Sequence, residues 1–235
     1  MNDHGHNALP RPAIPGSPAR AGPVVGAEPR AAAAGHGGQR PPRWRKFDPE
    51  TFNDPDGRIA DFGYDILKRS HAGKQYSAVA YLRRKLRWPN GLLNHAVPHR
   101  DVVATILLVP PACPDLLAEP DALWSRLDAE FISHDQHLLA GPTIWFPGVA
   151  SQHGAIRMVR EFAQHQVVDR LDVAAQLVAH APNRICLAGD FHIHLLFSAR
   201  TIGPQGFGTF AQDILGRGCQ KRMHEQWRAW AAGAA

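Results

Sequence analysis

This sequence of 235 residues contains neither long apolar runs nor paired cysteines. No run reaches the roughly eighteen apolar residues that a membrane-spanning helix needs. The N-terminus, MNDHGHNALPRPAIPG, lacks the apolar segment of a secretory signal. The three cysteines, Cys113, Cys186 and Cys219, are far apart in the sequence and form no CxxC pair, which argues against a disulfide framework. We therefore expect a protein of the reducing cytoplasm.

Positive charge is concentrated at one end of the chain. The formal net charge is +5 at pH 7, and residues 1–45 carry six arginines against only Asp3 and Glu28. Proline, glycine and alanine dominate this segment, so it cannot bury enough apolar surface to offset the entropy cost of folding. We predict a disordered tail over residues 1–58, either a solvated linker or a weak contact to an anionic polymer, and a folded domain over residues 59–235.

Beyond this tail, the spacing of apolar residues predicts strands and helices. Runs rich in β-branched or alternating residues favour strands over residues 63–69, 101–110, 140–148, 172–180 and 190–200. Helical spacing favours helices over residues 76–88, 119–133, 153–171 and 213–232. Gly203 and Gly208 bound a predicted loop. Together these elements predict an α+β fold, with a two-layer, about five-stranded antiparallel sheet and helices mainly on one face.

Two histidines interrupt the apolar run DFHIHLLFSAR at residues 190–200. Because side chains alternate between the faces of a strand, His192 and His194 share a face with Leu196, and the opposite face is wholly apolar. His180 ends the preceding predicted strand. If the two strands are antiparallel neighbours, the three imidazoles converge with coordination positions left vacant, which is typical of a catalytic metal site. Alternatively, they are ordinary histidines of the core or a sheet edge.

All three tyrosines, Tyr64, Tyr76 and Tyr81, lie within one short window beside the basic stretch LRRKLRW. A phenol is a poor nucleophile at its ordinary pKa, and nearby cations or a metal favour the phenolate. Packing tyrosines beside a solvated basic face would give the same pattern. Tyr64, at the start of a predicted strand, fits a packing role.

In order along the chain, these segments resemble the relaxase domain of the MobA/MobL family, the DNA-nicking enzymes that mobilise plasmids. The resemblance rests on the following segments: ILKRSHAGKQYSAVAY, ILLVPPACPDLLAEPDALWSRLDAEF, MVREFAQHQVVDRLDVAAQLVAHAP, DFHIHLLFSARTIGPQGFG and EQWRAWAA. The family tyrosine usually follows the serine by seven residues, whereas Tyr81 follows Ser77 by four. Where the family often has acidic residues, this chain has Gly141 and Thr143. Asp190 and Phe191 replace a common Asn-Pro, and the Asp190 carboxylate is a candidate to orient an imidazole.

The resemblance implies a His-hydrophobe-His endonuclease that nicks and rejoins single-stranded DNA at a transfer origin. His180, His192 and His194 would hold a divalent ion, Mg²⁺ or Mn²⁺, and Tyr81 would form a 5′-phosphotyrosine, with Tyr76 as its rival. Accessory mobilisation proteins are expected partners. The residues expected to contact DNA phosphates are Lys74, Arg83, Arg84, Lys85 and Arg87.

Two other functions fit the same residues. A relative that kept the fold but lost the chemistry would bind DNA without forming a covalent adduct. An unrelated three-histidine hydrolase would turn over a small substrate without nucleic acid and would not depend on Tyr81.

Overall fold

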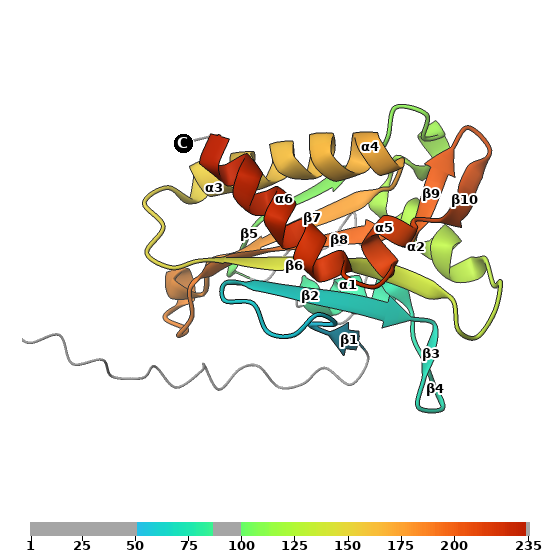
Figure 1. Cartoon of the computed structure of the whole chain (residues 1–235), viewed down its shortest axis with the longest axis horizontal. Coiled ribbons are helices and arrows are strands. Elements are labelled where there is room, and N and C mark those ends of the chain that lie inside the picture. The colour runs from blue at the N-terminus through green and yellow to red at the C-terminus, as the bar shows by residue number, and fades with distance from the viewer. Residues whose placement is uncertain (1–50, 87–99, 234–235) are drawn as a thin grey trace, which may run out of the picture. The chain divides into compact units, whose positions relative to one another are not determined.

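The computed structural model describes residues 51–86 and 100–233, all within the unit formed by residues 41–235. At its centre is a six-stranded sheet in the order β1-β2-β6-β8-β7-β5, in which every neighbouring pair is antiparallel (Figure 1). This confirms the predicted α+β fold with an antiparallel sheet. Its strands are β1 (Thr51–Asn53), β2 (Phe62–Lys68), β5 (Val102–Leu108), β6 (His137–Phe146), β7 (Ala175–His180) and β8 (Phe191–Ser198).

Two short hairpins extend from the ends of this sheet. They are β3 (Ser70–His71) with β4 (Lys74–Gln75), and β9 (Arg200–Gly203) with β10 (Gly206–Phe210). The loop predicted between Gly203 and Gly208 is therefore wrong, because Gly203 ends β9, residues 204–205 form the turn, and Gly206 begins β10, which also contains Gly208. Glycine is uncommon in strands, so the local sequence does not predict the pairing of β9 with β10.

Helices cover both faces of the sheet, most of them on one (Figure 1). The apolar core on the more covered face, termed the α3/α6 core, includes side chains of α3, η3 and α6. The smaller core on the opposite face, termed the α1/α2 core, includes side chains of α1 and α2. The helices are α1 (Ala78–Lys85), η2 (Asp115–Leu117), α2 (Pro120–Ala129), α3 (Gln152–Phe162), η3 (Ala163–Val168), α4 (Asp169–Leu171), η4 (Pro182–Ile185), α5 (Gln212–Leu215) and α6 (Cys219–Gly233).

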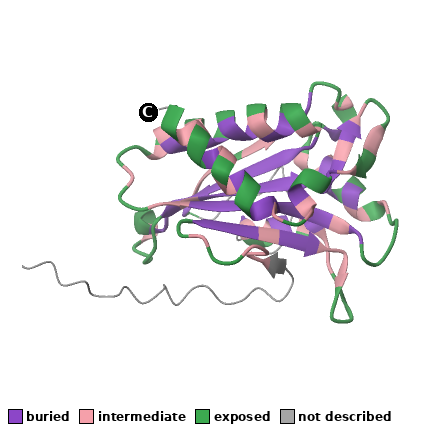
Figure 2. Cartoon of the chain, viewed as in Figure 1, coloured by how far each residue is buried: buried purple, intermediate pink, exposed green. Residues whose placement is uncertain are grey.

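Strand β8 shows how the sequence divides the two faces. Phe191, Ile193, Leu195 and Phe197 are buried in the α3/α6 core. Leu196 belongs to the α1/α2 core, so the alternation places the two histidines of β8 on that face. Figure 2 shows that the central strands are largely buried. The wholly apolar face expected from the sequence therefore packs against helices.

Helix α1 is fixed by a carboxylate from helix α2. The Asp128 side chain accepts hydrogen bonds from the Ser77 hydroxyl (2.6 Å) and from the backbone N–H groups of Ala78 (2.7 Å) and Val79 (3.1 Å). The Ser77 hydroxyl in turn accepts from the Ala80 N–H, which makes Ser77 the N-cap. Because Asp128 satisfies two N–H groups that the first turn leaves unpaired, it sets where α1 begins.

The ordered sheet begins before the predicted domain boundary at residue 59, since β1 pairs with β2. The rest of the predicted tail, residues 1–50, lies outside the described residues. Among the described helices, none is long and apolar enough to cross a bilayer. The three cysteines, which all lie in the described part of the chain, are free thiols.

Candidate metal centre and nucleophile

The three predicted histidines converge on the α1/α2 face of the sheet. Strands β7 and β8 are antiparallel neighbours, and His180 lies directly opposite His192 in their register. The candidate ligand atoms of His180, His192 and His194 all lie within 4.8 Å of one another. His180 and His194 are only 2% and 9% exposed. The sequence predicts this cluster on the condition that the two strands are antiparallel neighbours, and the structure meets that condition.

Each imidazole is held through its Nδ1 atom. For His180, this atom lies 3.3 Å from Oδ2 of Asp101, which is fully buried. The Nδ1 of His192 lies 2.9 Å from the Asp190 carbonyl oxygen, and that of His194 lies 2.7 Å from the Thr143 hydroxyl. Oxygen partners on Nδ1 orient a neutral imidazole so that Nε2 serves as the metal ligand. The donor set therefore fits a divalent ion bound by three Nε2 atoms.

The orienting groups differ from those expected. Asp190 acts through its backbone carbonyl, so the predicted role of its carboxylate is not what the structure shows. Sequence reasoning missed Asp101 and Thr143 as orienting residues. Thr143 lies opposite His194 in the register of β6 and β8. At Gly141, a Cβ atom would overlap the Leu195 carbonyl oxygen, so the sheet leaves no room there for an acidic side chain.

Tyr81 lies on the same face but outside the histidine cluster. Its hydroxyl donates to Oδ2 of Asp65 at 2.7 Å, and its side chain is 1% exposed. Asp65 on β2 pairs with Gly141, and His194 lies one strand further on, opposite Thr143. Two strand spacings and a two-residue step place the Cα atoms of Asp65 and His194 roughly 12 Å apart.

Two cations lie against the Tyr81 ring. Nζ of Lys85 and Cζ of Arg84 are 4.9 and 5.2 Å from the ring centroid. Lys85 also approaches Oδ2 of Asp65 at 3.4 Å. The basic stretch that the sequence places beside the tyrosines therefore contacts the Tyr81 ring.

The other two tyrosines have different surroundings. Tyr76 donates its N–H to the Arg69 carbonyl at the end of β2 next to the β3–β4 hairpin. At this end of the sheet, Lys68 of β2 pairs with His137 of β6. His137 lies six residues before Thr143, which is opposite His194, so Tyr76 is roughly 20 Å from the histidine cluster along the strand direction. Tyr64 is buried, and its hydroxyl donates to the Ile214 carbonyl; burial raises its pKa well above the ordinary value. Tyr64 thus packs in the core, and Tyr76 lies farther from the cluster than Tyr81.

The predicted DNA-contacting cations differ in their exposure to solvent. Lys74 is exposed at the tip of the β3–β4 hairpin, and Arg84 is exposed on α1. Arg83 and Lys85 are half-buried, and Lys85 contacts Asp65. Arg87 lies outside the described residues.

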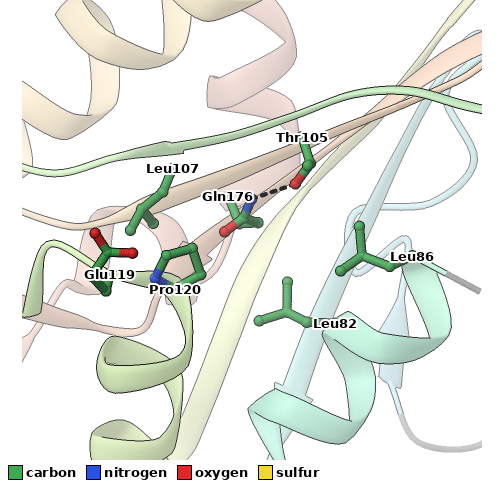
Figure 3. Close-up of a pocket in the computed structure, with 7 residues that line it drawn as sticks. All are labelled: Leu82, Leu86, Thr105, Leu107, Glu119, Pro120 and Gln176. Carbon is green, nitrogen blue, oxygen red and sulfur yellow. Dashed lines mark hydrogen bonds between the residues drawn. The ribbon is translucent and has the colours of Figure 1, made fainter. Parts of the chain in front are cut away.

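A pocket of about 220 Å³ lies on the same sheet face between α1, the start of α2 and strands β5 and β7 (Figure 3). Its walls are largely aliphatic, and the Gln176 amide donates to the Thr105 hydroxyl at 2.9 Å. Glu119 is the charged residue among its described lining residues. An apolar pocket that contains a carboxylate is poorly suited to hold a phosphate.

Residues 93–232 match the model of the MobA/MobL family. This range is more than half of the chain and contains the three histidines of the cluster, His180, His192 and His194. The chain belongs to the MobA/MobL family. This is the family that the sequence resemblance predicted. Helix α1, with Tyr81, precedes the matched range.

No curated protein matches this chain. One similar solved structure concerns the molecular basis of vancomycin resistance transfer in Staphylococcus aureus. It is 19% identical with a TM-score of 0.43, and the similarity covers 55% of this chain. The MobA/MobL-type chain described here spans 66% of that structure's chain.

Proposed function

We propose that this member of the MobA/MobL family is a relaxase that nicks and rejoins single-stranded DNA at a plasmid transfer origin. The observation that carries the proposal is the cluster of His180, His192 and His194, each oriented through Nδ1. Family membership supports it, because the resemblance to the MobA/MobL relaxases implies that the chain acts on plasmid DNA. A divalent ion bound there would polarise the scissile phosphate and offset the charge that develops during phosphoryl transfer.

The donor set limits which ion fits best. Mg²⁺ prefers oxygen ligands and keeps several waters, whereas imidazole nitrogens suit transition metals such as Zn²⁺ and Fe²⁺. All three candidate protein ligands here are imidazoles. Of the two ions predicted from the resemblance, Mn²⁺ is therefore the better candidate, because it is the transition metal of the pair. The ions to compare are Mn²⁺, Mg²⁺ and Zn²⁺.

Tyr81 is the proposed nucleophile. In the transfer, its phenolic oxygen would bond to phosphorus as the bond from phosphorus to the 3′-oxygen breaks. Once the ring has left Asp65, the phenolic proton would pass to solvent as the new bond forms, and the departing 3′-oxygen would take a proton from solvent. The product is a 5′-phosphotyrosine and a free 3′-hydroxyl, so rejoining requires no nucleotide cofactor. Because Tyr81 is 1% exposed, its ring must leave Asp65 before it meets DNA.

The full chain should be incubated with an end-labelled pool of random single-stranded DNA and each of the three ions. A covalent adduct on a denaturing gel is the expected result, and mass spectrometry of the digested adduct should locate the DNA on Tyr81. Tyr81→Phe removes the nucleophilic oxygen and should abolish the adduct while retaining DNA affinity. Tyr76→Phe is the matched control and should retain the adduct. An adduct that maps to Tyr76 would move the nucleophile there.

A second function is favoured by the burial of Tyr81 and its bond to Asp65. A chain whose tyrosine stays in the core would bind single-stranded DNA through the same surface without cutting it. Metal retention and DNA binding, with no adduct for any of the three ions, would indicate this function. A small-molecule hydrolase predicts turnover without DNA, and the family assignment gives no support to it.

A further inference from the structure

We propose that Arg100 and Arg184 form a second phosphate site, which holds a DNA backbone phosphate next to the one at the histidines. Both arginines line an open cavity of about 590 Å³ together with Ile185 and Cys186. This proposal rests on the proposed function, because it takes single-stranded DNA as the substrate. It adds residues that the sequence analysis did not single out.

The backbone ties both arginines to the His180 end of the histidine cluster. Arg100 precedes Asp101, whose carboxylate contacts His180 and whose carbonyl accepts the Ala181 N–H at 2.7 Å. On the other side, the Arg184 N–H donates to the Ala181 carbonyl at 3.0 Å, within η4. The cavity is therefore built from segments that immediately flank a candidate metal ligand.

The register limits how far these arginines lie from the cluster. Val102 pairs with His180, Arg100 lies two residues before Val102, and Arg184 lies four residues after His180. The extended length of a chain then places both Cα atoms within about 14 Å of the His180 Cα. An arginine side chain spans much of that distance. A strand with one phosphate per nucleotide can therefore place one phosphate at the histidines and a neighbouring one in the cavity.

The chemistry of the cavity fits a phosphodiester. Two guanidinium groups offer paired N–H donors that match the oxygens of a phosphate. None of the described lining residues is acidic, and both arginines are exposed. Neither arginine forms an ion pair with another residue in the described ranges 51–86 and 100–233. Binding a phosphate here does not require breaking a described salt bridge.

The double variant Arg100→Gln/Arg184→Gln tests the site in the full chain. The probe is a fluorescent thymidine 20-mer with Mn²⁺, measured by anisotropy from 50 to 300 mM NaCl. Losing two phosphate contacts should lower the log–log salt slope by about 1.4. Affinity at 100 mM NaCl should fall by about tenfold or more, as expected for losing charge-assisted hydrogen bonds. Bound Mn²⁺ per chain should not change.

The charge-matched control is Arg157→Gln/Arg160→Gln, on the exposed side of α3, across the sheet from the histidines. It should leave the slope near the wild-type value. Equal slopes for the two double variants would overturn the arginine site. If the Arg100/Arg184 variant does not fold, each single variant should lower the slope by about 0.7.

The two proposals fail in distinguishable ways. If wild type forms no adduct but the Arg100/Arg184 variant still loses salt slope, the phosphate site stands and the nicking proposal fails. If the adduct forms and neither its amount nor the DNA slope depends on these arginines, nicking stands and the phosphate site is wrong.

Discussion

Replacing Asp101 with asparagine should weaken metal binding by about 10- to 100-fold, or roughly 1.4 to 2.7 kcal/mol. Asp101 is the only charged group among the three Nδ1 partners, and it is fully buried. A buried negative charge that accepts from His180 makes the imidazole a better donor and partly balances the ion. Asparagine keeps the size of the side chain but removes this charge.

The chain provides a matched control for this prediction. Asp190→Asn makes the same chemical change beside His192, yet the contact there is made by the backbone carbonyl. Its metal affinity should therefore stay within about twofold of wild type, since the exposed side chain contributes little. Competition of Mn²⁺ and Zn²⁺ against a fluorescent chelator measures both variants. If Asp101→Asn binds as tightly as wild type while His180→Ala loses the ion, the carboxylate does not tune the site.

Three further predictions concern the framework of the site. Asp128→Ala should lower the free energy of unfolding by about 2 kcal/mol in urea titrations, because it removes the acceptor for the start of α1. Gly141→Ala should destabilise the sheet by about 3 kcal/mol, since the new Cβ would overlap the Leu195 carbonyl; an unchanged melting temperature would contradict this. Burial, and then Lys68, lowers the pKa of His137 below its ordinary value. The unfolded chain then binds more protons than the folded chain, so the free energy of unfolding should fall as the pH drops below about 6.5. The fall should be smaller in His137→Gln.

Much of the candidate site was predictable because strand periodicity needs no tertiary information. The alternation in β8 separates the histidine face from the apolar face, and both assignments agree with the structure. Convergence with His180 required one further assumption, that the two strands are antiparallel neighbours. Short connections between successive strands make that arrangement common.

The partners of the histidines could not be predicted in the same way. Asp101 lies 79 positions from His180 in the sequence. Its side chain contacts His180 because β5, which follows Asp101, pairs with β7 at the edge of the sheet. No local pattern specifies that strand order. One helix boundary was also wrong: the helix predicted over residues 119–133 extends past Ala129, where α2 ends, and Phe131 beyond it is 57% exposed.

The depth of Tyr81 follows from where α1 begins. Asp128 and Ser77 fix the first turn, so a residue four positions after Ser77 faces the sheet and meets Asp65. The family spacing of seven would place the tyrosine three residues later, about 300° around the helix and 4.5 Å along its axis. Arg84 occupies that position and is exposed. The shorter spacing therefore exchanges an exposed hydroxyl for a buried one paired with a carboxylate, so any chemistry at Tyr81 requires its ring to leave the α1/α2 core.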